Sequence, residues 1–246
     1  RQVSVKNISD AAKEIEVIDG LPKIITYGIA NGEFKEMSNL FKSWAYIKNL
    51  DHKVPYYTLR ASKNDSAEVS AVEGGYYYLT IKDGQLQDVI YDIDTVFGYD
   101  LSLMTPVKFI DGGIEAVKAK KQCFANKVPC GFTPFKETVA AGDAITFDTM
   151  MGFAGSEEQI NAKLDTFTKP GYIADKFVEA EELADSFTSD VKTHTAAGKF
   201  DQYIEQCYLD NFLRGGYPYV LNKDGNKSII HLFSRKHGDP ERDYNF

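Results

Sequence analysis

The feature that most constrains the fold of this chain is a change in the spacing of its apolar residues near Gly155. Before Gly155, apolar side chains alternate with polar ones, which is typical of strands that bury one face. After Gly155, they recur about every 3.6 residues, which is typical of amphipathic helices. The sequence therefore predicts a β domain over 1–154, helices over 155–216, and a short further segment over 217–246.

The β region consists of alternating runs separated by turn residues. Gly, Asn and Asp cluster between the runs and supply the backbone angles that tight turns need. Many short strands joined by turns favour an antiparallel sandwich over alternating β and α units. One insert, 33–47, has its apolar residues at helical spacing and predicts a short helix over a sheet. The alternating runs are 3–5, 15–17, 77–81, 89–93, 107–109 and 145–147.

The helical region begins with Ser156-Glu157-Glu158-Gln159, a capping box in which the Ser and Gln side chains can each satisfy a free backbone amide. We expect later helices with an apolar stripe from Ile173 to Val191 and over 199–214. The stripe is too short for a coiled coil, so we expect it to pack on the β domain or on a neighbouring domain. Residues 219–221 and 228–233 should pair as a hairpin, because an Asp-Gly turn signal lies between them.

Charge and composition exclude several classes of function. The chain has 28 Lys and Arg against 36 Asp and Glu, a net charge of −8, and no basic cluster. This balance argues against binding to nucleic acid or to an anionic membrane surface. No apolar run reaches the roughly 18 residues that a membrane span needs. Cys123, Cys130 and Cys207 are too few and odd in number for a disulfide scaffold, so we expect a reducing, cytoplasmic compartment.

The 1–233 region carries no strong catalytic or metal motif. Cys123 and Cys130 lack the paired spacing of a zinc site, and the nucleophile, phosphate-loop and dinucleotide signatures are missing. We therefore predict no catalytic residue, no metal and no cofactor in this chain. Asp92 and Asp94 fall on one face of a predicted strand, which we interpret as its solvated face, with acid–base or cation chemistry as the lesser alternative. The aromatic residues, 13% of the chain, are interpreted mainly as core, with sugar stacking as the alternative.

A dense ionisable run follows the last apolar segment. Two interpretations stay open for it: an exposed loop, or the rim of a polar pocket in which Arg forks and carboxylates bind hydroxyls or a phosphate. The candidates for substrate contact in this run are Arg235, Asp239, Arg242 and Asp243.

Several ordered blocks match one family. Val5-Lys6-Asn7-Ile8-Ser9-Asp10 and Glu14-Ile15-Glu16-Val17 form a strand, a turn and a strand. The later blocks are Ser38-Asn39-Leu40-Phe41, Val139-Ala140-Ala141-Gly142-Asp143, Met151-Gly152-Phe153-Ala154, Ser234-Arg235-Lys236-His237-Gly238-Asp239 and Glu241-Arg242-Asp243-Tyr244-Asn245. In this order, the blocks resemble the N-terminal β domain of cellobiose phosphorylase-like glycoside phosphorylases and, in the last two, the segment where large bacterial members enter their catalytic barrel.

The resemblance implies a mostly β chain with α-helices: an antiparallel mutarotase-like β super-sandwich followed by linker helices. It makes 217–246 the start of a truncated catalytic-domain segment, with the catalytic α/α barrel beyond Phe246. It implies a cytoplasmic parent that cleaves a β-linked disaccharide or oligosaccharide with inorganic phosphate, using a general acid that belongs to the barrel. This chain would be a non-catalytic domain that braces the barrel, shapes one side of the substrate opening and contributes to a homodimer interface. The family's sandwich normally has further strands before Val5, so either its first part is missing or the domain is unusually short.

Other functions remain open at this stage. The chain is alternatively a free-standing carbohydrate-binding or structural β-sandwich, or part of a hydrolase in which water attacks instead of phosphate. Because the chain begins at Arg1 without Met and stops in a polar and aromatic run, we expect a piece of a longer protein. Whether the chain belongs to an enzyme is left open, and the chain alone is predicted to be inactive.

Overall fold

The computed structural model describes residues 1–63, 67–215, 219–223 and 226–230. The chain divides into two compact units, Arg1–Tyr172 and Ile173–Phe246. The first unit holds two antiparallel sheets, and the second holds two long helices and a two-stranded hairpin.

The larger sheet of the first unit runs through strands that are far apart in the sequence. Its strands are β1 (Gln2–Lys6), β3 (Ala45–Lys48), β4 (Tyr56–Leu59), β5 (Gly75–Lys82), β6 (Gln85–Leu86) and β9 (Ala144–Ala154). They lie in the order β1-β9-β5-β4-β3, and β6 pairs with β5. The sheet therefore joins the first strand of the chain to the last strand of the unit, with β3 at one edge.

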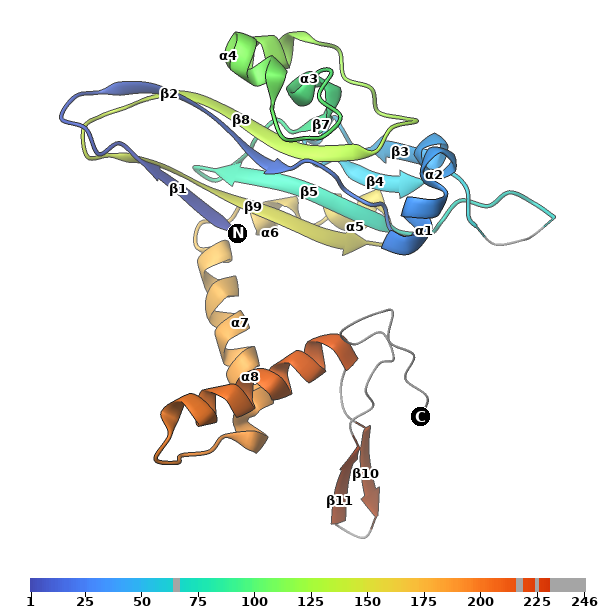
Figure 1. The fold of residues 1–246 in the computed structure, drawn as a ribbon, viewed down its shortest axis with the longest axis vertical. Helices are drawn as coiled ribbons and strands as arrows, with labels where there is room; N and C mark the ends of the chain where they lie inside the picture. The colour runs from blue at the N-terminus through green and yellow to red at the C-terminus, as the bar shows by residue number, and fades with distance from the viewer. Residues whose placement is uncertain (64–66, 216–218, 224–225, 231–246) are drawn as a thin grey trace. The chain divides into compact units, whose positions relative to one another are not determined.

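The smaller sheet lies against the larger one (Figure 1). Its strands are β2 (Lys13–Leu21), β7 (Ile90–Asp92) and β8 (Pro129–Val139), in the order β2-β8-β7. Phe135 of β8 and Phe147 of β9 meet with ring centroids 4.3 Å apart in the shared core. The hydroxyls of Thr80 and Thr133 hydrogen-bond across the same interface at 2.7 Å, which satisfies two buried polar groups.

Short helices surround the two sheets (Figure 1). They are α1 (Asn31–Glu36), α2 (Ser38–Trp44), α3 (Asp94–Phe97), α4 (Val107–Ala119), α5 (Glu157–Asn161) and α6 (Leu164–Phe167). The helices α3 and α4 cover the outer face of the smaller sheet, α5 and α6 pack on the larger one, and α1 and α2 lie at one end. Val96 of α3 and Val117 of α4 are buried with Cys130 on the smaller sheet. Ile160 of α5 and Phe167 of α6 are buried against the larger sheet. Burial of these side chains holds the short helices, which are too short to be stable alone.

The second unit consists of α7 (Tyr172–Thr188), a 3₁₀ turn (Ser189–Val191), α8 (Gly198–Gly215), β10 (Tyr219–Lys223) and β11 (Asn226–Ile230). Phe187 and Phe212 stack with centroids 4.8 Å apart and so join α7 to α8. Earlier in α7, Phe177, Val178 and Leu183 are about half exposed. The apolar stripe of α7 is therefore only partly covered.

The structure confirms most of the predicted elements but contains more helix than was expected from the sequence. The strands at 3–5, 15–17, 77–81 and 145–147, and the hairpin after 219, are present. Ser156 caps α5 by accepting the Gln159 amide at 3.4 Å, while the Gln159 side chain accepts the Gly155 amide at 2.9 Å. The described residues form a mixed α and β fold with antiparallel sheets, where a mostly β fold with some α-helix was expected.

Three predicted elements differ from those observed. The run 89–93 forms only the short strand β7, and Asp94, expected on the same strand face as Asp92, is the first residue of α3. Residues 107–109 were predicted as a strand but form the start of α4, because Ile114 and Val117 continue the apolar spacing as a helix face. The predicted helix over 33–47 is two helices separated at Met37, and it ends at Trp44 because β3 follows directly. Among the described residues, no helix combines the length and the apolar character that a membrane crossing requires.

Candidate functional site

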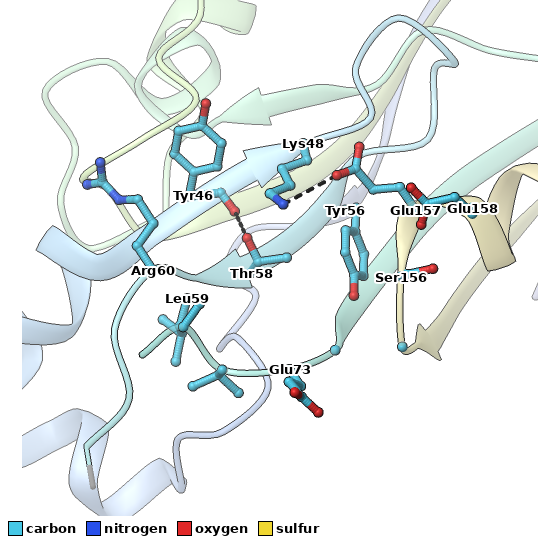
Figure 2. A pocket seen from close by; sticks show the side chains of 14 residues that line it. Tyr46, Lys48, Tyr56, Thr58, Leu59, Arg60, Glu73, Ser156, Glu157 and Glu158 are labelled. Atoms are coloured by element: carbon cyan, nitrogen blue, oxygen red, sulfur yellow. Dashed lines mark hydrogen bonds and ion pairs between the residues drawn. The ribbon is translucent and has the colours of Figure 1, made fainter. Parts of the chain in front are cut away.

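A pocket lies on the outer face of the larger sheet, where β3 pairs with β4 (Figure 2). Its volume is about 680 Å³. Small-molecule sites in proteins have volumes of roughly 300–1,000 Å³, so the pocket is large enough for a ligand of that class. Every residue that lines it belongs to the first unit.

Strand alternation places the floor and one wall of this pocket. Tyr46 pairs with Thr58 and Lys48 pairs with Tyr56, so these four side chains share one face of the sheet. The residue between Tyr56 and Thr58 is Tyr57, which points to the opposite face and donates a hydrogen bond to the Cys130 carbonyl of the smaller sheet at 2.9 Å. Tyr57 therefore ties the larger sheet to the smaller one. Of the four outer side chains, Tyr56 and Thr58 are buried, whereas Tyr46 and Lys48 keep accessible surface.

The other walls come from two turns next to β5 and β9. Residues 71–74 precede β5, and residues 155–158 connect β9 to α5. Gly74 has a φ of +83°, and a side chain there would lie 2.6 Å from the Phe153 ring. Glycine is therefore required at this corner of the pocket, because it alone adopts this angle readily and leaves room for the ring.

Charged side chains of both signs surround the pocket (Figure 2). The lining includes two basic residues, Lys48 and Arg60, and three acidic residues, Glu73, Glu157 and Glu158. The Lys48 Nζ lies 3.4 Å from a Glu157 carboxylate oxygen. Both side chains remain in contact with solvent. The Lys48 ammonium and the Glu157 carboxylate can therefore give up this weak ion pair and bind a ligand instead.

Two other segments of the chain hold the Arg60 side chain in place. Its guanidinium donates to the Ser43 carbonyl at 2.8 Å and to the Asn126 side-chain oxygen. It also lies over the Tyr46 ring, 5.4 Å from the centroid, which is within cation–π range. On another side, the Phe124 ring meets Tyr46 edge-on at 5.4 Å. Tyr46 is thereby fixed as a rigid wall.

The protonation states of two pocket residues follow from their neighbours. Hydrogen bonding from the Ser156 side chain, with smaller contributions from a backbone amide and from Lys48, lowers the pKa of Glu158 below its ordinary value. Burial raises the pKa of Tyr56, and the charges of Glu157 and Glu158 raise it further. Tyr56 therefore stays neutral, and its hydroxyl donates to the Ala154 carbonyl at 2.9 Å. At neutral pH the pocket offers an ionised Glu158 and a neutral Tyr56.

This arrangement suits binding by hydrogen bonds better than proton transfer. A general acid at neutral pH needs a carboxyl whose pKa is raised, and the pKa of Glu158 moves the other way. Ionised carboxylates accept hydrogen bonds from hydroxyls, and ammonium groups donate to them. The pocket thus offers both kinds of partner to a ligand rich in hydroxyls.

The carboxylates singled out in the sequence occupy a different place. Asp92 was interpreted as lying on a solvated strand face, but its residue is only 2% exposed, at the end of β7. Its carboxylate accepts from the Cys123 amide at 2.9 Å and from the Lys127 Nζ at 3.0 Å. The interpretation was wrong because α3 and α4 cover the outer face of the smaller sheet.

The predicted substrate contacts Arg235, Asp239, Arg242 and Asp243 lie outside the described residues. Within the part of the chain that the structure describes, no group of His, Cys, Asp and Glu side chains is arranged to hold a metal ion. Cys130 is buried, which raises the pKa of its thiol well above the ordinary value, whereas Cys123 is exposed.

The sequence reasoning missed the pocket residues. Lys48, Arg60 and Glu157 are common surface residue types in no recognised motif, and Glu157 drew notice only as part of the capping box. The available signal was the alternation at 46, 48, 56 and 58, which places polar and aromatic side chains on one strand face. No protein-family model matches this chain, and no curated protein matches it.

Proposed function

We propose that this chain is the non-catalytic β domain of a carbohydrate-active enzyme that resembles cellobiose phosphorylase. In this proposal the two antiparallel sheets with their shared core are a mutarotase-like sandwich, and α7 and α8 are linker helices. The parent enzyme cleaves β-linked disaccharides or oligosaccharides with inorganic phosphate, in the cytoplasm. Its catalytic acid belongs to an α/α barrel outside this chain.

The observation that carries the proposal is the chemistry of the pocket on β3 and β4. It places the Tyr46 ring, an exposed Lys48–Glu157 ion pair and an ionised Glu158 around one space. Aromatic surface next to paired hydrogen-bond donors and acceptors suits a sugar, which has apolar ring faces and many hydroxyls. The lowered pKa of Glu158 suits a role in binding rather than in proton donation.

A second candidate is a free-standing carbohydrate-binding module. It is favoured by the fact that the residues lining the pocket all come from Arg1–Tyr172, one compact unit. A site built within one unit needs no catalytic domain to complete it. The two candidates differ in whether the full-length protein turns over sugars.

The experiment measures phosphate-dependent release of sugar 1-phosphate from cellobiose and other β-linked disaccharides. We expect no turnover by the 246-residue chain and turnover by the full-length protein that contains it. Turnover by the chain alone would overturn the non-catalytic assignment. Inactivity of the full-length protein on every disaccharide tested, with sugar binding retained, would favour the free-standing module.

A further inference from the structure

We infer that the pocket between β3, β4 and the 155–158 turn binds an uncharged oligosaccharide and discriminates against phosphorylated sugars. The inference rests on the proposed function for the class of ligand, a carbohydrate, and goes beyond it in assigning the site and its charge preference. In a phosphorolytic parent, such a site holds substrate or polymer chain but does not hold the sugar 1-phosphate product.

Neither cation of the pocket is arranged to bind an anion. The Arg60 guanidinium donates to the Ser43 carbonyl and to Asn126, and it lies over the Tyr46 ring. Its fork therefore points to protein partners, whereas a phosphate site needs a fork directed at the ligand. The Lys48 ammonium is 3.4 Å from a Glu157 oxygen, and the negative charge of this carboxylate opposes the attraction of Lys48 for an anion.

The carboxylates make the pocket unfavourable for a phosphate. Glu73, Glu157 and Glu158 outnumber Lys48 and Arg60, so the lining carries a net negative charge. Glu158 is ionised at neutral pH, because hydrogen bonding from Ser156 lowers a pKa whose ordinary value, 4.5, is already acidic. Carboxylates accept hydrogen bonds from sugar hydroxyls but repel a phosphate dianion, which has no proton to donate to them.

The remaining lining fits the uncharged parts of a sugar. Tyr46 and Val72, which are half-buried, add apolar surface to the same space. Lys48 and Glu73 are exposed, so the pocket opens to solvent on their side. An oligosaccharide can therefore place one part in the pocket while its chain continues outward.

The binding experiment uses the 246-residue chain and isothermal titration calorimetry at neutral pH. The uncharged probes are two β-linked tetrasaccharides, cellotetraose and laminaritetraose, and the charged probe is glucose 1-phosphate. We expect at least one tetrasaccharide to bind and glucose 1-phosphate to bind at least about tenfold more weakly. Failure of both tetrasaccharides to bind, or equal or tighter binding of glucose 1-phosphate, would overturn the inference.

Variants test whether the pocket is the site. Tyr46→Ala should weaken tetrasaccharide binding at least about tenfold, whereas Tyr99→Ala, which removes a tyrosine that is 80% exposed elsewhere, should leave it unchanged. Circular dichroism and thermal unfolding check that each variant is folded. Equal loss in both variants, or no loss in folded Tyr46→Ala, would place the sugar elsewhere.

A charge change tests the discrimination directly. The double variant Glu157→Gln with Glu158→Gln makes the lining net positive and should tighten glucose 1-phosphate binding by about tenfold or more, with a smaller change for the tetrasaccharide. The matched control is Glu14→Gln with Glu137→Gln, since both residues pair with lysines outside the pocket. An unchanged preference in the folded pocket variant would contradict the charge argument.

These outcomes separate the inference from the proposed function. Phosphorolysis by the full-length protein together with no tetrasaccharide binding by this chain would sink the inference alone. Tetrasaccharide binding at the pocket together with no phosphorolysis would sink the phosphorylase parent and leave the site assigned.

Discussion

Among the ion pairs that lysines form with acidic side chains in the first unit, those of Lys127 and Lys48 differ in burial. Lys127 contacts Asp92 at 3.0 Å and Asp94 at 2.6 Å, and the Asp92 side chain is 1% exposed. Lys48 contacts Glu157 at 3.4 Å, and the Glu157 side chain is 33% exposed. The same residue types therefore stabilise the fold in one place and remain open to a ligand in the other.

Backbone hydrogen bonds explain the difference. The Asp92 carboxylate accepts the amides of Cys123 and Asp94 as well as the Lys127 ammonium, so it ties the segment after α4 to the end of β7. A buried carboxylate needs such partners, because burial without them is strongly unfavourable. Glu157 lies at the first turn of α5, where solvent supplies the alternatives. Burial, and not residue type, distinguishes an ion pair that stabilises the fold from one whose charged groups remain accessible to a ligand.

The largest expected effect is at the buried pair. Asp92→Ala should lower the free energy of unfolding by about 3 kcal/mol, because it removes the acceptor of the Cys123 amide and of Lys127. Urea denaturation of the 246-residue chain, followed by tyrosine fluorescence, measures the change.

Asp94→Ala is the matched control for this substitution. It removes the other acidic partner of Lys127. Because the Asp94 side chain is 37% exposed, its loss should lower the free energy of unfolding by less than about 1 kcal/mol. Equal losses from the two substitutions would mean that burial does not distinguish Asp92, and the comparison would fail.

The strands of the fold follow from the sequence because alternation is a local property. The runs at 3–5, 77–81 and 145–147 each carry their own period, and each forms a strand. The role of Asp92 does not follow in this way. Alternation shows which face of the strand the side chain is on, but it does not show which other elements cover that face. The cover comes from α3 and α4, which follow it in the chain and fold back on the smaller sheet.

The candidate site is harder to predict because its parts are distant in the sequence. Lys48 and Glu157 meet only after β3, β4, β5 and β9 have paired in order, and Arg60 contacts Asn126, which is 66 residues away in the sequence. Strand order and register depend on the packing of both sheets, which the period of one strand does not encode. Whether polar residues on a strand face belong to a binding site therefore cannot be decided until the neighbouring strand is known.

A smaller effect is expected at the turn that forms one wall of the pocket. Ser156→Ala removes the acceptor of the Gln159 amide and should cost about 1 kcal/mol, the usual contribution of a helix N-cap. It also removes the main cause of the lowered pKa of Glu158, so that pKa should rise toward its ordinary value of 4.5. Carboxyl carbon NMR titration of Glu158 measures the second effect, with Ser189→Ala as the control.

The sign of the pH dependence follows from this direction. Because the folded-state pKa of Glu158 lies below the ordinary value, its ionised form favours folding above pH 4.5, and that contribution is lost as pH falls through the lowered pKa. In Ser156→Ala the pKa of Glu158 in the folded chain should approach its value in the unfolded chain. The free energy of unfolding should therefore depend less on pH in the acid range between these two values. An unchanged Glu158 titration in the variant would show that Ser156 does not hold the carboxylate.

The smallest effect on stability is expected at the exposed pair of the pocket. Lys48→Gln should change the free energy of unfolding by less than about 0.5 kcal/mol, because both partners keep solvent and an exposed ion pair contributes little. Lys53→Gln, at an ion pair with Asp88 that is at least as exposed, should have the same small effect on urea denaturation. Only Lys48→Gln should weaken tetrasaccharide binding, because only Lys48 lines the pocket. A loss of stability as large as that of Asp92→Ala would make the Lys48–Glu157 pair a structural tie like the buried one, and would remove the contrast on which the binding assignment depends.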